Sequence, residues 1–537
     1  MLSTDVLVIG AGGAGMYAAI AAAEQGARVL LIDRSLIGRG GATVMAQMTV
    51  AAATIDRYAD HWQHHLADTL AAGRGLCDEG LAALLCETGV ACIEQMAEWR
   101  VGWARDGAGF AKVQAPGHDR PRCVYVDVLN TGPAVSRALR ARVQRVPEIR
   151  RIGDLLVTDI IVQGGEARGA MALDITSGQG VTIVAGATII ATGGLTRLYA
   201  RNSASANMGG DGYALALRAG ARLRDMEFVQ FFPIGHLAPR MIGMDPIMWD
   251  PFRYKLGGRL LNAAGADVMG GDAGYSTTRD VTTQAILREV AAGRGSPAGG
   301  AYLSFTHLDA GTLRAAFGPV IDRLAANGID LTRDMVEVSP MAHYHMGGVA
   351  VSTTMATDVH GLFAAGEAVG GAQGANRLSG NAITEAFAFG RQAGLHAARY
   401  AASATVLPAQ SAGLAEAHGP HCNPAAMFET LQALMTRDVG PLRDAASLSR
   451  AAEGLDALDI DLGEAPPGRP APHDLARIDW LDLRQALLVA RAVVQAAQSR
   501  TESRGAHQRE DFPDTLAGWQ HSQWQELRGG TPCLVKA

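Results

Sequence analysis

Two basic side chains stand where they could hold a carboxylate group. Arg377 lies between Gly374 and Gly380 in a loop with little apolar content, and a guanidinium in such a loop is suited to bidentate binding of a carboxylate. His343 precedes a Gly-Gly turn and could hydrogen-bond the same group. On the residues alone, Arg377 could also form an internal salt bridge, and His343 could be a structural histidine. The sequence therefore indicates an anion site without fixing its nature.

Three glycines near the N-terminus have the G-x-G-x-x-G spacing that is typical of a dinucleotide-binding turn. Gly10 permits the tight turn, Gly12 lets the backbone approach a pyrophosphate, and Gly15 lets the next helix pack on the sheet. That helix is expected over residues 14–25, and its N-terminus favours phosphates because its free N–H groups and dipole attract anions. Asp33 ends the next apolar strand and can accept hydrogen bonds from an adenosine ribose. These residues predict a bound dinucleotide but do not separate FAD from NAD.

Two later segments complete a flavin site. Residues 187–194 are expected to form a buried strand that ends in the turn Ala-Thr-Gly-Gly, after a meander of alternating strands over 152–185. Residues 360–367 form another expected strand, which ends on Glu367, and a helix follows from about 381. This order resembles the flavoproteins with two dinucleotide-binding folds, in which both segments complete the FAD site. The resemblance implies an α/β protein with a Rossmann-like FAD-binding domain.

Length, charge and cysteine content bound the remaining classes of protein. A chain of 537 residues is expected to form two or three domains, and a net charge of −6 without a basic block argues against a nucleic-acid partner. The six cysteines contain no C-x-x-C pair, so we expect free thiols in a reducing compartment, no internal iron–sulfur cluster and no metal site. No apolar stretch approaches the roughly 18 residues that span a bilayer, and the chain enters a strand by residue 5, without room for a signal peptide. We therefore expect a cytoplasmic protein without direct membrane insertion.

Several longer motifs run through the chain. They are the segment 210–232, the run His343-Tyr344-His345-Met346-Gly347-Gly348, the run Gly374-Ala375-Asn376-Arg377-Leu378, and the C-terminal run Arg500-Thr501-Glu502-Ser503-Arg504-Gly505-Ala506-His507. Together they resemble the succinate dehydrogenase/fumarate reductase flavoprotein family over essentially the whole chain. The overall layout is most similar to the L-aspartate oxidases and soluble fumarate reductases of that family.

The resemblance implies three domains. Residues 1–230 and 335–400 are expected to form a discontinuous FAD-binding domain. Residues 231–334 are expected to form an inserted α+β capping domain that closes over the substrate. Residues 401–537 are expected to supply a linker and a C-terminal helical domain, with a core-facing helix over 475–500.

The resemblance also implies a reaction centre. Arg279 opens an expected helix, and in the family this arginine transfers a proton beside flavin N5. Burial beside another cation, or a relay to Asp280, would make an arginine workable in that role, whereas a surface pair with Asp280 is the alternative on the residues alone. Arg377 and His343 would anchor a carboxylate while hydride passes between N5 and the adjacent carbon. His345 is a secondary candidate for substrate contact.

The FAD contacts that this pattern implies come mostly from glycine-rich turns and strand ends. In respiratory members a histidine at the position of Ala42 links FAD covalently, so FAD is expected to be bound non-covalently here and to have a potential less suited to oxidising succinate. The expected cofactor-binding residues are Gly10, Gly12, Gly13, Ala14, Gly15, Asp33, Arg34, Gly41, Ala42, Thr43, Gln47, Ala191, Thr192, Gly193, Asn202, Asp211, Glu367, Arg377, Asn381, Ala382 and Ile383.

Two departures from the family pattern concern the substrate. Phe232 replaces the histidine that holds the second carboxylate in dicarboxylate enzymes, which removes two hydrogen-bonding nitrogens and adds an apolar wall. A Thr-Glu pair expected downstream is absent, and the aromatic-rich stretch 248–255 stands in its place. This stretch is either a repacked lid surface or a pocket for a longer or more apolar substrate, in which Arg253 or Lys255 meets a distal anion. Fumarate, succinate and aspartate themselves are therefore doubtful substrates.

The function that these features indicate is an FAD-dependent oxidoreductase acting on the α,β C–C bond of a small carboxylate, as a reductase or a dehydrogenase. One alternative is an amino acid oxidase like L-aspartate oxidase, which acts on a C–N bond. An alternative of another class is a flavin subunit that relays electrons inside a larger redox complex. An iron–sulfur or other electron-transfer protein partner would bring its own metal centres, because the chain lacks cysteine clusters.

Overall fold

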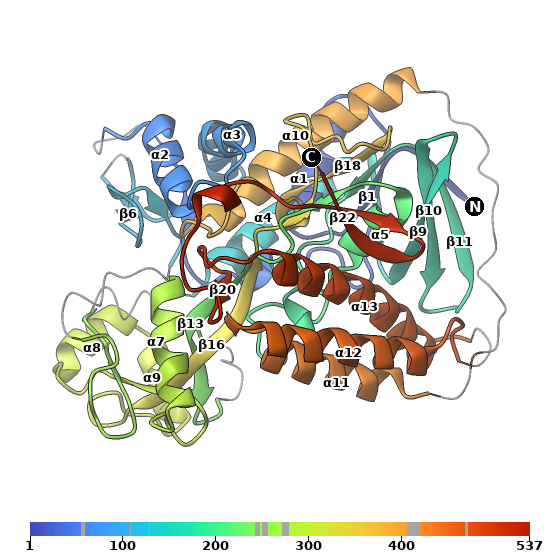
Figure 1. Cartoon of the computed structure of the whole chain (residues 1–537). Coiled ribbons are helices and arrows are strands. Elements are labelled where there is room, and N and C mark those ends of the chain that lie inside the picture. Colours follow the sequence, from blue (N-terminus) through green and yellow to red (C-terminus); the bar gives the residue numbers. More distant parts are fainter. Residues whose placement is uncertain are drawn as a thin grey trace.

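The computed structural model shows an α/β body, a smaller cap at one side of it and a layer of C-terminal helices (Figure 1). The described residues are 1–54, 59–107, 109–127, 129–241, 247–249, 256–270, 279–404, 419, 422–467 and 471–536. Arg253 and Lys255, two expected substrate contacts, lie outside the described residues, as does most of the expected linker between the body and the C-terminal helices.

The body is built on a seven-stranded sheet. Four parallel strands have the order β8 (Ile149–Ile152), β2 (Val29–Ile32), β1 (Leu2–Ile9) and β11 (Gly180–Ile190), and β18 (Leu362–Ala364) pairs in parallel with the end of β11. Strand β2 is buried throughout and β1 over its last four residues, as expected of a parallel sheet that is covered on both faces. The strands thus end side by side at the edge where the predicted glycine motifs begin.

The expected meander of alternating strands is present and extends this sheet. Strands β9 (Leu155–Gln163) and β10 (Glu166–Asp174) pair antiparallel with each other, and β10 pairs antiparallel with the first half of β11. Strand β11 therefore returns the chain to the nucleotide-binding sheet, as the sequence predicts.

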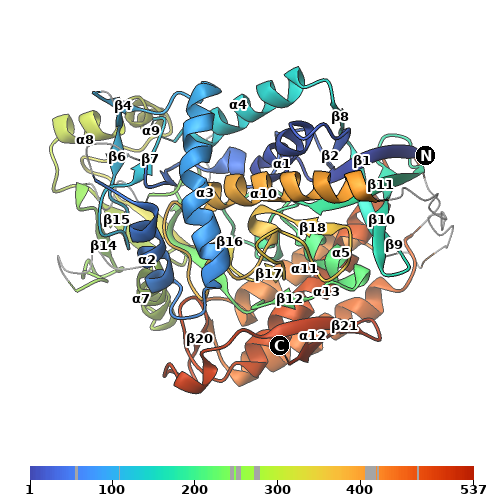
Figure 2. The ribbon, with the colours of Figure 1, turned by 90° about the horizontal axis from the view of Figure 1, so that it is seen from above.

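Two helices with small side chains lie against each other on one face of the sheet (Figure 2). Helix α1 (Gly13–Ala23) follows β1, is buried along its whole length and packs against α10 (Asn381–Ser403). The backbones come close because glycine stands at the crossing: a Cβ added at Gly390 would lie 2.6 Å from the carbonyl oxygen of Ala14, and one added at Gly394 would lie 2.2 Å from that of Ala18. The alanine-rich composition of α1 therefore follows from its packing.

Among the described helices, one is long and apolar enough to cross a membrane by length and composition. This is α3 (Glu79–Glu98), whose most apolar 18-residue window is 44% buried inside the protein. It packs against α2 (Trp62–Ala72) and α10, as the core helix of a globular domain does. The expectation that no stretch approaches spanning length was therefore wrong for this segment, because an inward-facing helix needs few charges.

The cap is an antiparallel sheet with helices and a core of its own. Its strand order is β13 (Val229–Ala238), β16 (Val336–His345), β15 (Ala301–Ser304) and β14 (Arg259–Leu261), and α7 (Arg279–Ala291) packs on β13 and β16. Two shorter helices, α8 (Ala310–Phe317) and α9 (Val320–Ala326), complete the cap, and Trp249, Phe305 and Phe317 lie in its core. Strand β13 crosses the expected domain boundary at 230, whereas β16 begins just after the expected boundary at 335. Both strands connect the body with the cap.

The C-terminal region forms a helical layer beneath the body. Its helices are α11 (Pro424–Asp438), α12 (Ala445–Leu462) and α13 (Leu475–Ser499), and α13 also packs on α5 (Asp211–Ala219). The final segment returns to the body as β21 (Trp524–Arg528) and β22 (Thr531–Val535), in one sheet with β12 (Leu223–Arg224) and β17 (Gly348–Val349).

The remaining elements are short or connect the larger ones. They are α4 (Thr131–Arg145), β3 (Val50–Ala51), β4 (Arg105–Asp106), β5 (Gly109–Phe110), β6 (Lys112–Val113), β7 (Cys123–Val124), β19 (Leu442–Arg443), β20 (Gln508–Arg509) and the 3-10 turns η1 (Thr43–Met45), η2 (Thr196–Leu198), η4 (Gly366–Ala368) and η5 (Ala517–Trp519).

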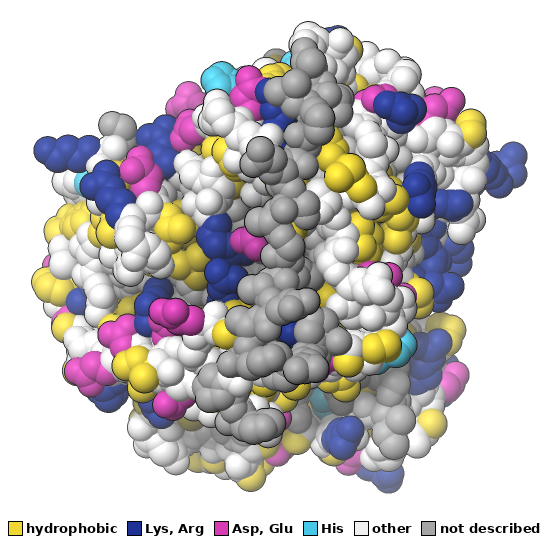
Figure 3. Space-filling view, turned by 90° about the vertical axis from the view of Figure 1, so that its right-hand side faces the viewer, with side chains coloured by type: hydrophobic (Ala, Val, Ile, Leu, Met, Phe, Trp, Pro, Cys, Tyr) yellow, Lys and Arg dark blue, Asp and Glu magenta, His cyan; other side chains and the backbone are white. Residues whose placement is uncertain are grey.

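The surface carries side chains of mixed character. Figure 3 shows acidic, basic and apolar side chains interspersed over one face, with Lys and Arg gathered along its right-hand edge.

Candidate functional site

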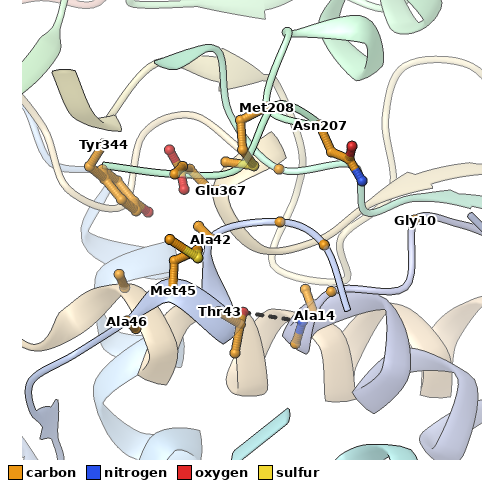
Figure 4. Close-up of a pocket in the computed structure, with 18 of the residues that line it drawn as sticks. Gly10, Ala14, Ala42, Thr43, Met45, Ala46, Asn207, Met208, Tyr344 and Glu367 are labelled. Carbon is orange, nitrogen blue, oxygen red and sulfur yellow. Dashed lines mark hydrogen bonds between the residues drawn. The ribbon is translucent and has the colours of Figure 1, made fainter. Parts of the chain in front are cut away.

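A long pocket runs through the body from the end of β2 to the start of α10 and ends under the cap. It encloses ≈ 1460 Å³ of space between atoms, part of which is open to solvent. Its walls come from β1, β2, β9, α1, η1, α10 and the first turn of α7. Figure 4 shows the glycine turn and η1 on one wall, with Glu367 and Tyr344 on the opposite wall.

The middle of the pocket is a glycine turn at the N-terminus of α1. Gly10 has φ +99°, and a Cβ added there would lie 2.5 Å from the carbonyl oxygen of Ala191. A Cβ at Gly15 would lie 1.8 Å from the oxygen of Gly10, whereas one at Gly12 would meet nothing within 4 Å because it points into the pocket. The N–H of Gly13 donates to Thr43 Oγ1 at 3.2 Å (Figure 4). The cradle leaves room for a pyrophosphate above a helix N-terminus, the place where anions are favoured.

The end of the pocket beside β2 is shaped for a nucleoside. Asp33 Oδ2 accepts a hydrogen bond from the N–H of Ala11 at 2.8 Å, which fixes the carboxylate at the pocket wall. Arg34 also lines the wall, and its Nη2 forms an ion pair with Asp482 at 2.7 Å that joins the pocket to α13. Burial raises the pKa of Asp211, a third polar side chain at this end, to about 6.

The opposite end of the pocket gathers basic side chains. Arg279, His343 and Arg377 all line it, together with Phe232 and Tyr344. The guanidinium carbon of Arg279 lies 5.3 Å from the ring centre of Phe232, and that of Arg377 lies 4.4 Å from the ring centre of Tyr344. Residues far apart in the sequence therefore form one site, because β13, β16, the 371–380 loop and the first residue of α7 all contribute to this part of the wall.

Burial controls the protonation of this basic group. Burial lowers the pKa of His343 well below its usual range, and the positive charges of the nearby Arg279 and Arg377 lower it further. Its imidazole is therefore neutral near pH 7. Burial and the charge of Arg279 lower the pKa of Arg377 to about 10, so its guanidinium remains charged near pH 7. Ser203 Oγ lies 2.7 Å from Nδ1 of His343 and fixes the orientation of the ring. The site thus combines fixed positive charge with a neutral hydrogen-bonding ring.

Most of the residues that the sequence nominates for this site line the pocket. Of the expected reaction-centre residues, Arg279, His343, Arg377 and Phe232 do so. The expected cofactor residues that also line it are Gly10, Gly12, Gly13, Ala14, Asp33, Arg34, Gly41, Ala42, Thr43, Gln47, Ala191, Thr192, Gly193, Asp211, Glu367, Ala382 and Ile383.

Four nominated residues lie outside the pocket wall. His345 is fully buried, with Nδ1 3.1 Å from the hydroxyl of Tyr213 and Nε2 3.1 Å from the carbonyl oxygen of Met226, and its expected contact with the substrate stays a prediction. Asn381 also faces away from the pocket, and its Oδ1 lies 2.7 Å from His65 Nε2. Asn202 bonds within its own loop, and Gly15 packs under the glycine turn. They can shape the walls but do not form them.

Several lining residues have no obvious sequence signal. Ser203, Asn207 and Met208 belong to the loop between β11 and α5, where spacing predicts no side-chain direction. Ser379 follows Arg377 closely, and its position in the Gly-rich loop was the one available hint. Leu155–Val157 of β9 line the nucleoside end from a strand whose pattern is that of ordinary core.

Comparison with known proteins accounts for this geometry. A family model described as an FAD binding domain matches residues 5–383, and one described as fumarate reductase flavoprotein C-term matches residues 428–529. The chain belongs to the succinate dehydrogenase/fumarate reductase flavoprotein family. It is therefore an FAD-dependent oxidoreductase, with the α/β body, capping domain and C-terminal helical domain of that family.

Relatives of this flavoprotein family match along nearly the whole chain. One subunit of the fumarate reductase (CoM/CoB) of Methanothermobacter marburgensis is 33% identical over 96% of this chain and 96% of its own. An L-aspartate oxidase of Streptomyces coelicolor is 33% identical over 96% of this chain and 89% of its own. The solved structure of the E. coli quinol fumarate reductase FrdA has a TM-score of 0.89 and 29% identity, covering 100% of this chain and 97% of that chain.

The pocket fits the FAD of this flavoprotein family. The glycine cradle accommodates the pyrophosphate, Asp33 can bind a ribose, and the N-terminus of α10 closes the end beside the basic group. FAD is bound non-covalently, because residue 42, on the pocket wall, is alanine and has no side chain that could form a link. The expectation of non-covalent FAD is confirmed.

Proposed function

We propose that this flavoprotein oxidises or reduces the α,β C–C bond of a monocarboxylate whose other end is apolar. FAD, when bound, supplies or accepts the hydride in this reaction. The protein side chains hold the carboxylate, exclude water and handle the proton. The observation that carries the proposal is the burial of the Arg377 guanidinium, without a hydrogen-bonded carboxylate among the described residues, at the basic end of the pocket.

Arg377 is a buried cation without a matching anion in the described chain. Its side chain is only 4% exposed, and the described residues offer it one hydrogen bond, from Nη1 to the carbonyl oxygen of Leu378 at 3.3 Å. Its buried Nε has no hydrogen-bond partner among those residues. An uncompensated guanidinium is costly to bury, and a bidentate carboxylate would satisfy both its charge and its N–H groups. This supports a carboxylate anchor at Arg377.

His343 is suited to hold the same carboxylate. When Ser203 donates to Nδ1, the remaining Nε2 carries the proton and can donate a hydrogen bond. A neutral donor adds direction to the binding without adding a further buried charge. Arg279 lines the same end of the pocket, and we assign it to proton transfer at the carbon next to the one that exchanges hydride.

Phe232 supports an apolar remainder for the substrate. The centre of its buried ring lies 5.4 Å from the ring centre of His343, so Phe232 forms an apolar part of the pocket wall beside the carboxylate anchors. A second carboxylate placed against a phenyl ring would lose its water without gaining a hydrogen bond, which costs several kcal/mol. Substrates such as trans-2-hexenoate therefore fit better than fumarate.

An amino acid oxidase is the second candidate, favoured by the 33% identity to L-aspartate oxidase. The charges in the pocket oppose it, because an ammonium group would approach Arg279 and Arg377. Glu367 also lines the pocket, but burial raises its pKa to about 8, so it is mostly neutral at pH 7. We infer that C–C chemistry is better supported than C–N chemistry.

Anaerobic titration of the flavin spectrum with mono- and dicarboxylates tests the anchor. We expect saturable spectral changes with trans-2-hexenoate, and Arg377→Ala should weaken that binding by roughly a hundredfold or more, since a buried charge-assisted pair is lost. Arg377→Lys should recover part of the affinity, because a point charge replaces the fork. Arg314→Ala, which removes an exposed cap arginine, is the control and should bind like the parent protein.

Unchanged binding in Arg377→Ala would refute the anchor. A peroxide assay in air with a panel of amino acids separates the second candidate, because an oxidase would consume oxygen with an amine. Turnover of trans-2-hexenoate with an artificial reductant would count against a pure electron-relay subunit with an iron–sulfur partner.

A further inference from the structure

The first two residues of α7, Arg279 and Asp280, both contact the body. Its Nη2 donates to Ser379 Oγ at 3.3 Å, and the carboxylate of the next residue, Asp280, lies 3.8 Å from Nη2 of Arg74. Arg279 and Asp280 begin α7, whereas Ser379 and Arg74 belong to loops of the body. The contacts between the first turn of α7 and the body therefore include a polar contact and an ionic contact.

Both contact points belong to the part of the body that carries Arg377. Ser379 is in the same loop as Arg377. The loop of Arg74 touches that loop directly, because the carbonyl oxygen of Gly73 accepts a hydrogen bond from the N–H of Ala375 at 3.0 Å. A Cβ added at Gly374 would lie 2.5 Å from the Gly73 oxygen, so no side chain fits between the two loops. The contact points for Arg279 and the carboxylate anchor thus form one packed unit.

The backbone at each contact point is also fixed by a hydrogen bond from another part of the body. The carbonyl oxygen of Ser379 accepts a hydrogen bond from Nε2 of His118 at 2.7 Å, and that of Arg74 accepts one from Nη1 of Arg504 at 2.7 Å. Arg74 has φ +55°, a left-handed conformation that a residue other than glycine adopts only where its surroundings hold it. The Arg74 loop is therefore positioned by its neighbours and can serve as a fixed support for α7.

We propose that Arg74 and Ser379 are positioning residues that clamp the start of α7 and set Arg279 relative to Arg377. The clamp aligns the proton-transfer side chain with the carboxylate anchor, because both clamp residues move with the Arg377 unit and not with the cap. The inference rests on the proposed function for the roles of Arg279 and Arg377, whereas the clamp itself is a statement about α7.

Two substitutions of Arg74 isolate the ionic contact. Arg74→Gln and Arg74→Lys keep a long side chain on the same left-handed backbone and differ in charge. With trans-2-hexenoate and an artificial reductant, we expect Arg74→Gln to lower kcat about fivefold while the dissociation constant of the carboxylate stays within about twofold of the parent value. Arg74→Lys should retain most of kcat. Ser379→Ala should also lower kcat, by about threefold, with FAD bound as in the parent.

A measurement without substrate keeps the clamp testable if the proposed reaction is wrong. In the FAD-loaded protein, Arg74→Gln should speed backbone hydrogen exchange at the start of α7 and leave α8 and α9 unchanged. In an Asp280→Asn background, Arg74→Gln should have no further effect, because the ionic partner is already neutral. Arg314→Gln, which breaks the 3.0 Å pair of Arg314 and Asp322 elsewhere in the cap, is the matched control and should leave α7 unchanged.

The results of these experiments distinguish a failure of the clamp from a failure of the proposed reaction. The clamp is overturned if Arg74→Gln exchanges like the parent protein, if its effect persists in Asp280→Asn, or if Arg74→Lys behaves like Arg74→Gln. If none of the carboxylates is turned over but α7 exchanges as expected, the proposed reaction fails and the clamp stands.

Discussion

The two ends of the pocket are built from different materials. The cofactor end is formed largely by backbone and by glycine and alanine side chains, at the N-terminus of one helix and the ends of parallel strands. The substrate end is formed by large side chains that are buried or half-buried, three of them basic, on elements far apart in the sequence. In the function proposed above, one end binds a constant ligand by shape and by backbone N–H groups, and the other binds a variable ligand by charge.

This difference indicates which amino-acid substitutions each end of the pocket can tolerate. A backbone cradle fails when any atom is added, because its surfaces already touch. A side-chain site can exchange one group for another and keep its fold, as Phe232 illustrates. We therefore expect substitutions at the cofactor end to act on folding or FAD, and those at the substrate end to act on ligand choice.

The largest expected effect separates two glycines of the cradle. Gly15→Ala would place a Cβ 1.8 Å from the oxygen of Gly10 and should destabilise the apoprotein by several kcal/mol or prevent its folding. Gly12→Ala meets no protein atom within 4 Å and has a negative φ of −72°, so apoprotein stability should change by less than about 0.5 kcal/mol. FAD affinity should nevertheless fall by roughly tenfold or more, because the methyl group occupies pyrophosphate space.

Thermal unfolding with and without added FAD distinguishes these two glycine effects. A Gly12→Ala protein that is unstable without FAD would contradict the cradle geometry. A Gly15→Ala protein as stable as the parent would contradict it as well.

A smaller effect is expected when Phe232 is replaced by histidine. Phe232→His adds hydrogen-bonding nitrogens to the wall of the substrate end and should strengthen binding of succinate or fumarate by roughly tenfold, about one hydrogen bond to a charged group. Binding of trans-2-hexenoate should weaken, because apolar contact is lost. Flavin titration measures both affinities, and Phe232→Leu, which is apolar but not aromatic, is the control. Equal gains for mono- and dicarboxylates would mean that this wall does not select the substrate.

The last expected effect concerns the pH dependence of stability. Burial raises the pKa of Glu367 to about 8, so the folded protein binds a proton that the unfolded chain loses above about 4.5. The stabilisation from this group is complete below pH 4.5 and is lost as the pH rises toward 8. Apo Glu367→Gln should therefore gain stability relative to the parent by about 1.4 kcal/mol per pH unit within this window. Denaturant unfolding at several pH values checks the slope, and parallel curves for parent and variant would rule out a neutral Glu367 in the folded protein.

Sequence patterns predicted the cofactor end well because that end depends on local rules. The G-x-G-x-x-G spacing, the apolar strands and the terminal Asp33 need only neighbouring residues to be interpreted. The helices that begin at Arg279 and Asn381 also lie where the sequence places them. Only small shifts occur, such as α1 at Gly13–Ala23 instead of 14–25.

The substrate end was harder to predict because it depends on side-chain direction. His343 and His345 lie on one strand, and either imidazole could have faced the pocket from sequence alone. Strand β16 is bulged where it pairs with β13, between Gln230 and Phe231, and a bulge changes the alternation of faces. Ser203 and Ser379 were missed because a hydroxyl in a loop carries no periodic signal. The family resemblance supplied the roles that spacing could not.

The cap enters and leaves the body through β13 and β16, and these strands are hydrogen-bonded neighbours, with Phe231 opposite Ala342 and Phe232 opposite Met341. An inserted domain whose two ends emerge side by side adds little loop-closure entropy to the host fold. The sequence of the cap between these two strands can therefore be substituted, lengthened or exchanged between relatives without disturbing the strand pair that anchors the cap. The same ladder carries Phe232 and His343 into the pocket. A cap transplanted from a relative would therefore be joined to the β13–β16 strand pair of the host. Because that pair carries Phe232 and His343, the host protein would still determine part of the substrate selectivity.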